Sequence, residues 1–175
     1  MARPLIAPTG IERTFSSDKI IVSKTDTNGI ITYANKVFLN IAGYTEDEVL
    51  KQPHNIIRHP DMPRCIFELL WQTISQRKEI FAYVINQSKN GDHYWVYAHV
   101  TPNFDSDMNI VGYHSSRRVP RSDVLPAIKD LYSILLDIEK KHTDSPKNAL
   151  AASMAAVLNL LKEKGVSYDE FIHNL

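Results

Sequence analysis

The segment His54–Pro63, with the sequence His-Asn-Ile-Ile-Arg-His-Pro-Asp-Met-Pro, holds the densest group of polar side chains in the chain. Prolines on both sides restrict its backbone and hold those side chains in a fixed relation. Arg58 offers a planar fork of donors that suits a phosphate or a carboxylate. Asp61 precedes a predicted helix and can serve as its N-cap. A ligand site, and a rigid connector in which Arg58 pairs with Asp61, both remain open on these residues alone.

Three further polar or aromatic positions are candidates for binding: Asn35, Asn86 and the pair Tyr94-Trp95. The Asn86 amide can both donate and accept, so it can pair with a ring edge that shows an N–H beside a C=O. An asparagine in a turn is the alternative. The aromatic residues either fill the core or enclose a flat heterocycle; they are Phe67, Trp71, Phe81, Tyr83, Tyr94 and Trp95.

The histidines and the single cysteine argue against a metal site and against covalent catalysis. His54 and His59 are five positions apart and His93 and His99 six, and neither spacing matches a helical pair of ligands. One axial histidine for haem remains open. Cys65 lies on the apolar side of a predicted helix, as a buried small hydrophobe would. No nucleophile arrangement and no glycine-rich phosphate loop appear in the sequence.

The charge balance limits the classes of partner. Lys plus Arg and Asp plus Glu are both 20 in 175 residues, so the net charge is zero. Nucleic-acid binding by bulk charge and attraction to anionic lipid are therefore not expected. The longest nearly apolar stretch, residues 149–161, is too short to span a bilayer. One cysteine fits a reducing cytoplasm.

The hydrophobic periodicity predicts an α+β domain followed by helices. Strands are expected at 19–24 and 30–34, joined by an Asn-Gly turn, and at 80–86, 94–104 and 110–116. Between the two groups lie short helices from Lys36 and Thr45, a loop over 51–63 and a longer helix over 62–76. We divide the chain into an N-terminal cap or arm (1–17), a central domain (18–120) and a C-terminal helical extension (121–175).

The extension contains two amphipathic stripes separated by a linker over 143–146. Spacing of 4-3-4-3 is typical of a helix-pair seam, and the first stripe follows it with Val124, Ile128, Leu131, Leu135 and Ile138. The second stripe consists of Leu150, Met154, Val157, Leu158 and Leu161. Such stripes serve as a contact or dimer surface, or they pack on each other or on the sheet.

Four stretches resemble the FAD-binding PAS domain of aerotaxis receptors of the Aer type over residues 18–120. They are Tyr33-Ala34-Asn35, Ala42-Gly43-Tyr44-Thr45, the run from Gln52 to Pro63, and Lys89 to Val96, with Gly112-Tyr113 and Ser116-Arg117 continuing the match. The resemblance implies a PAS fold: a five-stranded antiparallel sheet with short helices on one face. It also implies non-covalent FAD whose redox state is reported to a chemotaxis transducer.

Carried over position by position, the resemblance implies a set of cofactor-binding residues. They are Asn35, His54, Arg58, His59, Asp61, Phe67, Trp71, Phe81, Asn86 and Tyr94. Two departures bear on affinity and redox tuning. Phe81 stands where the family has tryptophan, and Gln87-Ser88 replaces an arginine-rich stretch. A light-sensing LOV mechanism is not expected, because the loop that would carry its reactive cysteine has none.

The short helical extension resembles the stand-alone PAS proteins of bipartite energy-taxis systems, such as CetB. That implies a cytoplasmic redox or energy-taxis sensor, not an enzyme, that signals to a separate membrane-bound transducer, with a homodimer as a further option. Two alternatives remain: a flavin or haem oxidoreductase, and a PAS module that binds haem, another small ligand or no ligand.

Overall fold

The computed structural model describes residues 6–142 and 145–175. Residues 1–5 of the predicted arm and residues 143–144 of the predicted linker therefore lie outside the described part. The elements follow in the order β1 (Ile21–Thr25), β2 (Ile31–Ala34), α1 (Lys36–Ala42), α2 (Glu46–Val49), the 3₁₀ helix η1 (His54–Ile57), α3 (Arg64–Ser75), β3 (Ile80–Gln87), β4 (His93–Phe104), β5 (Ile110–Arg118), α4 (Leu125–Lys141), α5 (Pro146–Lys164) and α6 (Tyr168–His173).

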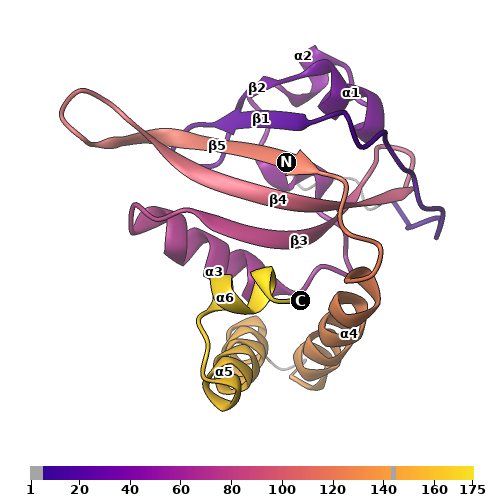
Figure 1. Cartoon of the computed structure of the whole chain (residues 1–175). Helices are drawn as coiled ribbons and strands as arrows, with labels where there is room; N and C mark the ends of the chain where they lie inside the picture. The colour runs from indigo at the N-terminus through magenta and orange to yellow at the C-terminus, as the bar shows by residue number, and fades with distance from the viewer. Residues whose placement is uncertain (1–5, 143–144) are drawn as a thin grey trace.

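Five strands of the described chain form one sheet in the order β2-β1-β5-β4-β3, and each neighbouring pair is antiparallel (Figure 1). Asn86 pairs with Tyr94 across β3 and β4. Because side chains alternate along a strand, both point to the same face, which we call the inner face. Phe81 lies five residues from Asn86, so its side chain points to the opposite, outer face.

The helices between β2 and β3 cover the inner face. Phe38 of α1 is fully buried, and its ring lies 5.8 Å from the Arg117 guanidinium of β5. Trp71 of α3 meets Tyr113 of β5 edge-on at 5.4 Å between ring centroids. Truncation of a buried phenylalanine such as Phe38 typically costs about 3–5 kcal/mol of stability.

The C-terminal extension packs along the free edge of β3 and beside α3 (Figure 1). The Tyr132 hydroxyl of α4 donates to the backbone oxygen of Tyr83 at 2.5 Å, in a buried position. On the outer face, Trp95 lies 6.0 Å from the Tyr132 ring, and Phe81 meets His173 of α6 at 4.7 Å. The extension therefore covers the free edge of β3, which could otherwise pair with other chains.

The described part of the N-terminal segment runs along the start of β4. Arg13 N–H donates to the His93 oxygen, and His93 N–H donates to the Ile11 oxygen. Gly91 has a φ of 95°, and a Cβ atom there would lie 2.5 Å from the Ala7 oxygen. Glycine is therefore required where this segment crosses the β3–β4 turn.

The predicted fold class is confirmed, and so are several local predictions. Asn35 caps α1, Gly43 ends it in the left-handed conformation, and Thr45 and Glu48 form the capping box of α2. Two predictions were wrong. The predicted loop contains η1, closed by a bond from Arg58 N–H to the Asn55 oxygen. The long helix begins at Arg64, and Pro63 occupies the N-cap position that we expected for Asp61.

Candidate functional site

A buried arginine, Arg117, lies at the centre of the inner face. Its side chain is 4% exposed, and its Nη2 atom donates to Ser23 Oγ at 2.9 Å and to His54 Nε2 at 2.7 Å. The sheet places Arg117 beside Ala98 of β4 and Ile21 of β1, so that a long side chain reaches across the face. Both acceptors are uncharged, because His54 can accept at Nε2 only as neutral imidazole.

Burial sets the protonation of this group. Burial and, to a smaller extent, the positive charge of Arg117 together lower the pKa of His54 from 6.5 to about 3. Burial also lowers the pKa of Arg117 to about 10, which still leaves the guanidinium charged at neutral pH. A buried charge without an opposite charge is costly, so the site favours a ligand that carries electron-rich atoms or negative charge.

Several other polar atoms of the inner face have no hydrogen-bond partner among the described residues. They are Asn86 Nδ2, Tyr94 Oη, Ser115 Oγ and Arg117 Nη1. Burial raises the pKa of Tyr94, so its phenol stays protonated and can donate. Buried donors normally find a partner, and unpaired ones indicate a site for something that is not part of the chain. Most of these groups donate, so the group that fits them is one rich in carbonyl oxygens and ring nitrogens.

The proline-framed segment lies beside this face. The backbone of Arg58 forms an antiparallel bridge with Asn86 on β3, and the Arg58 guanidinium lies 4.5 Å from the Phe67 ring centroid. His59 is 3% exposed and accepts from Asp61 N–H at Nδ1, 3.1 Å away. Arg58, His59, Phe67 and Asn86 thus lie near one another in the structure.

Other predicted residues have structural tasks or lie at the surface. The Asn35 amide accepts from Phe38 N–H and Val22 N–H and donates to the Ile20 oxygen. The Asp61 carboxylate is 70% exposed and lies 3.8 Å from His59 Nδ1. Trp71 is 39% exposed and sits over Gly29.

Phe81 is not brought to this site. It stacks on His99 at 4.2 Å between centroids, with the planes 2° apart, on the outer face. The adjacent departure from the family pattern also has structural partners. Gln87 donates to the Ile6 oxygen, and Ser88 donates to the Ile41 oxygen.

Arg117 is the residue that reading the sequence missed as a site residue. The predicted strand over 110–116 ended one residue before Arg117, whereas in the structure β5 includes it and the alternate positions Tyr113 and Ser115 are buried. An arginine at an inward position of a strand is unusual enough to single out.

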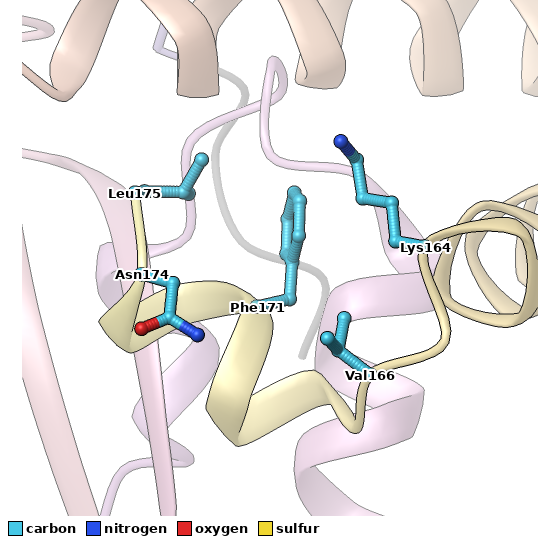
Figure 2. Close-up of a pocket in the computed structure, with 5 residues that line it drawn as sticks. All are labelled: Lys164, Val166, Phe171, Asn174 and Leu175. Carbon is cyan, nitrogen blue, oxygen red and sulfur yellow. The ribbon is translucent and has the colours of Figure 1, made fainter.

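A cavity of about 290 Å³ lies away from these residues, at the end of the extension (Figure 2). It is lined by Lys164, Val166, Phe171, Asn174 and Leu175. None of the predicted cofactor-binding residues lines it. Within residues 6–142 and 145–175, no cluster of three or more metal-ligating side chains occurs, and no helix has the length and hydropathy to cross a bilayer.

Comparisons with known proteins match most of the chain. A family model described as PAS fold matches residues 31–117. The aerotaxis receptor of Escherichia coli K12 is 39% identical over 120 residues, which are 69% of this chain and 24% of that receptor. The nitrogen fixation regulatory protein of Klebsiella pneumoniae is 31% identical over 99 residues, which are 57% of this chain and 20% of that protein.

Solved structures agree with this fold. The dark structure of the blue-light photoreceptor Aureochrome1 LOV superposes with a TM-score of 0.56 at 22% identity, over 68% of this chain and 86% of that one. The chain spans about a quarter or less of the length of the curated relatives named above. Given the strand order, the helices on the inner face and these matches, the chain contains a PAS domain.

Proposed function

We propose that this chain is a redox or energy-taxis sensor that holds FAD non-covalently on the inner face of its PAS sheet and signals to a separate chemotaxis transducer. The observation that carries the proposal is the buried, uncompensated Arg117 guanidinium beside the unpaired donors of Asn86 and Tyr94. The likeness to an aerotaxis receptor and to LOV structures, one of them from work on the LOV mechanism with a flavin analogue, supports flavin as the group.

The donor set fits a flavin ring. Its edge presents carbonyl oxygens and ring nitrogens, which complement the guanidinium, amide and phenol groups of the site. Bound flavin would supply a planar ring that accepts one or two electrons. The chain supplies a fixed positive charge at Arg117, which favours electron-rich states, and His54 keeps the guanidinium oriented through Nε2.

Four of the other candidate residues have a defined part in this proposal. Asn86 reads the polar ring edge with its amide, while its backbone anchors the Arg58 segment. Arg58 and His59 contact the polar part of the cofactor, and Phe67 supports Arg58 from below. Phe81 and Asp61 take no direct part, because one faces the outer side of the sheet and the carboxylate of the other is exposed.

The proposed setting is the cytoplasm, with output through a membrane-bound transducer and without an enzymatic turnover. The extension offers the contact surface: Ile134 and Leu158 are 59% and 53% exposed on α4 and α5. Large apolar side chains at such positions suit binding to a second helical protein or to a second copy of this chain.

The test combines a spectrum with an activity assay. The purified chain is supplied with FAD, reduced with dithionite and reoxidised in air while its visible flavin band is followed. In a second assay on the same protein, NADH consumption is measured. We expect the band to bleach and return without sustained NADH turnover. Sustained turnover would favour an oxidoreductase, and a haem Soret band would replace flavin with haem. In cells lacking the gene, wild-type protein should restore energy taxis and Asn86→Ala should not.

A further inference from the structure

The residue at the N-cap of helix α3 makes no side-chain hydrogen bond to the start of the helix. Pro63 occupies the N-cap position, and its side chain has no group that can accept a hydrogen bond. The first N–H groups of a helix have no partner within the helix, so acceptors must come from elsewhere. This start follows directly on the segment that carries Arg58 and His59.

The acceptor comes from the C-terminal extension. Glu139 Oε1 of α4 accepts from Arg64 N–H at 2.8 Å and from Cys65 N–H at 3.3 Å. The same oxygen accepts from Ser153 Oγ of α5 at 3.0 Å. A carboxylate at the positive end of a helix is favourable both as a hydrogen-bond acceptor and as a charge. One oxygen thus joins α3, α4 and α5.

Helix α4 makes a second attachment close by. Tyr132 and Glu139 are seven residues apart, so they lie on the same side of the helix, two turns from each other. Tyr132 donates to the Tyr83 oxygen on the free edge of β3, and three residues further along β3 Asn86 bridges Arg58. Residues 58–63 therefore connect the bridge on β3, three residues from the Tyr83 attachment, with the start of α3, where Glu139 is attached.

We propose that Glu139 is the positioning residue through which the extension and the cofactor segment are coupled, so that loss of its cap loosens residues 58–65 and weakens cofactor binding. The cofactor part rests on the function proposed above. By linkage, a ligand that orders residues 58–63 also favours the docked extension. Glu139 touches no ligand in this scheme and acts through the start of α3.

The first test needs no cofactor. Amide hydrogen exchange is measured on the full chain for wild type, Glu139→Ala, Glu139→Gln and the control Asp137→Ala, whose exposed carboxylate on the same helix pairs with Lys140. We expect exchange at Arg64 and Cys65 to rise about fivefold in Glu139→Ala, as for loss of a cap, and less in Glu139→Gln, which keeps an acceptor oxygen. Amides of β1 and β5 should not change. Equal exchange at Arg64 and Cys65 in Glu139→Ala and Asp137→Ala would overturn the proposal.

The second test uses FAD as the probe. The dissociation constant, the near-UV and visible circular dichroism of bound flavin, and the flavin midpoint potential are compared across the same variants. Relative to wild type, we expect FAD binding to weaken and the flavin dichroism to change most in Glu139→Ala and less in Glu139→Gln. Asp137→Ala should behave like wild type. Unchanged dichroism and affinity in Glu139→Ala would overturn the coupling. Failure of wild type itself to bind FAD would overturn the proposed function, while the exchange experiment would still judge the role of Glu139.

Discussion

Arg117 donates to Nε2 of the half-buried His54 across 2.7 Å, which fixes the imidazole in its neutral form with the proton on Nδ1. The pair joins η1 to β5 and places one uncompensated positive charge inside the domain. Both the stability of the domain and its proposed ligand depend on this arrangement.

Replacing Arg117 by methionine should remove cofactor binding without unfolding the chain. The substitution keeps much of the side-chain volume and removes a buried charge that has no opposite charge. Removal of this uncompensated charge offsets the cost of leaving Ser23 Oγ and His54 Nε2 without their arginine donor, which is about 1–3 kcal/mol. Urea unfolding of the FAD-free protein and FAD titration measure the two effects. The control is Arg118→Met, at an exposed neighbouring position. FAD affinity equal to wild type in Arg117→Met would remove Arg117 from the site.

The His54 pair predicts a dependence of stability on pH. In the folded state the pKa of His54 is about 3, while in the unfolded state it is near 6.5. Below pH 6.5 the unfolded imidazole takes up a proton and the folded one does not, so this contribution is present above pH 6.5 and is lost as pH falls towards 3. The loss is about 1.4 kcal/mol per pH unit.

The measurement is the free energy of unfolding at pH 6.5 and at pH 5 for wild type and His54→Gln. Wild type should lose about 2 kcal/mol more than the variant over this range. Glutamine retains an oxygen that can accept from Arg117, so the comparison isolates the titration. Parallel pH profiles for the two proteins would show that His54 does not titrate in this way.

Two asparagines should separate cofactor binding from folding. Asn86→Ala removes an unpaired amide, so we expect loss of FAD with little change in unfolding free energy. Asn35→Ala removes the cap of α1 and a bond to the Ile20 oxygen, so we expect a loss of about 1–2 kcal/mol in stability. FAD titration and urea unfolding of both variants check this. The reverse assignment, with Asn35→Ala stable and unable to bind FAD, would contradict it.

Removing the Tyr132 hydroxyl should weaken the attachment of the extension to β3. Tyr132→Phe removes the hydroxyl that donates to the Tyr83 oxygen and leaves a buried acceptor unpaired, at a cost of about 1–3 kcal/mol. The midpoint of thermal unfolding measures this. Tyr33→Phe is the matched control, since Tyr33 is 44% exposed. An unchanged midpoint in Tyr132→Phe would mean that this bond does not hold the extension.

Local signals in the sequence were enough for the strands, the order of elements and the caps of α1 and α2, but not for the cap of α3. Asn35, Gly43 and Thr45 act within a few residues of themselves, so their tasks can be predicted from neighbours alone. Phe81 and Asn86 are an odd number of residues apart on the same strand, so their side chains point to opposite faces. Strand alternation alone could therefore have placed Phe81 on the outer face. Glu139 could not be predicted, because its cap on Arg64 joins residues 75 positions apart. The central position of Arg117 could not be predicted without the register between β4 and β5.

The absorption spectrum of the purified full chain, before and after addition of FAD and with identification of the released cofactor, tests the central claim most directly. The account predicts a visible flavin band that releases FAD on denaturation and is lost in Arg117→Met but kept in Arg118→Met. A chain that stays colourless with excess FAD, or one that releases a different group, would contradict it.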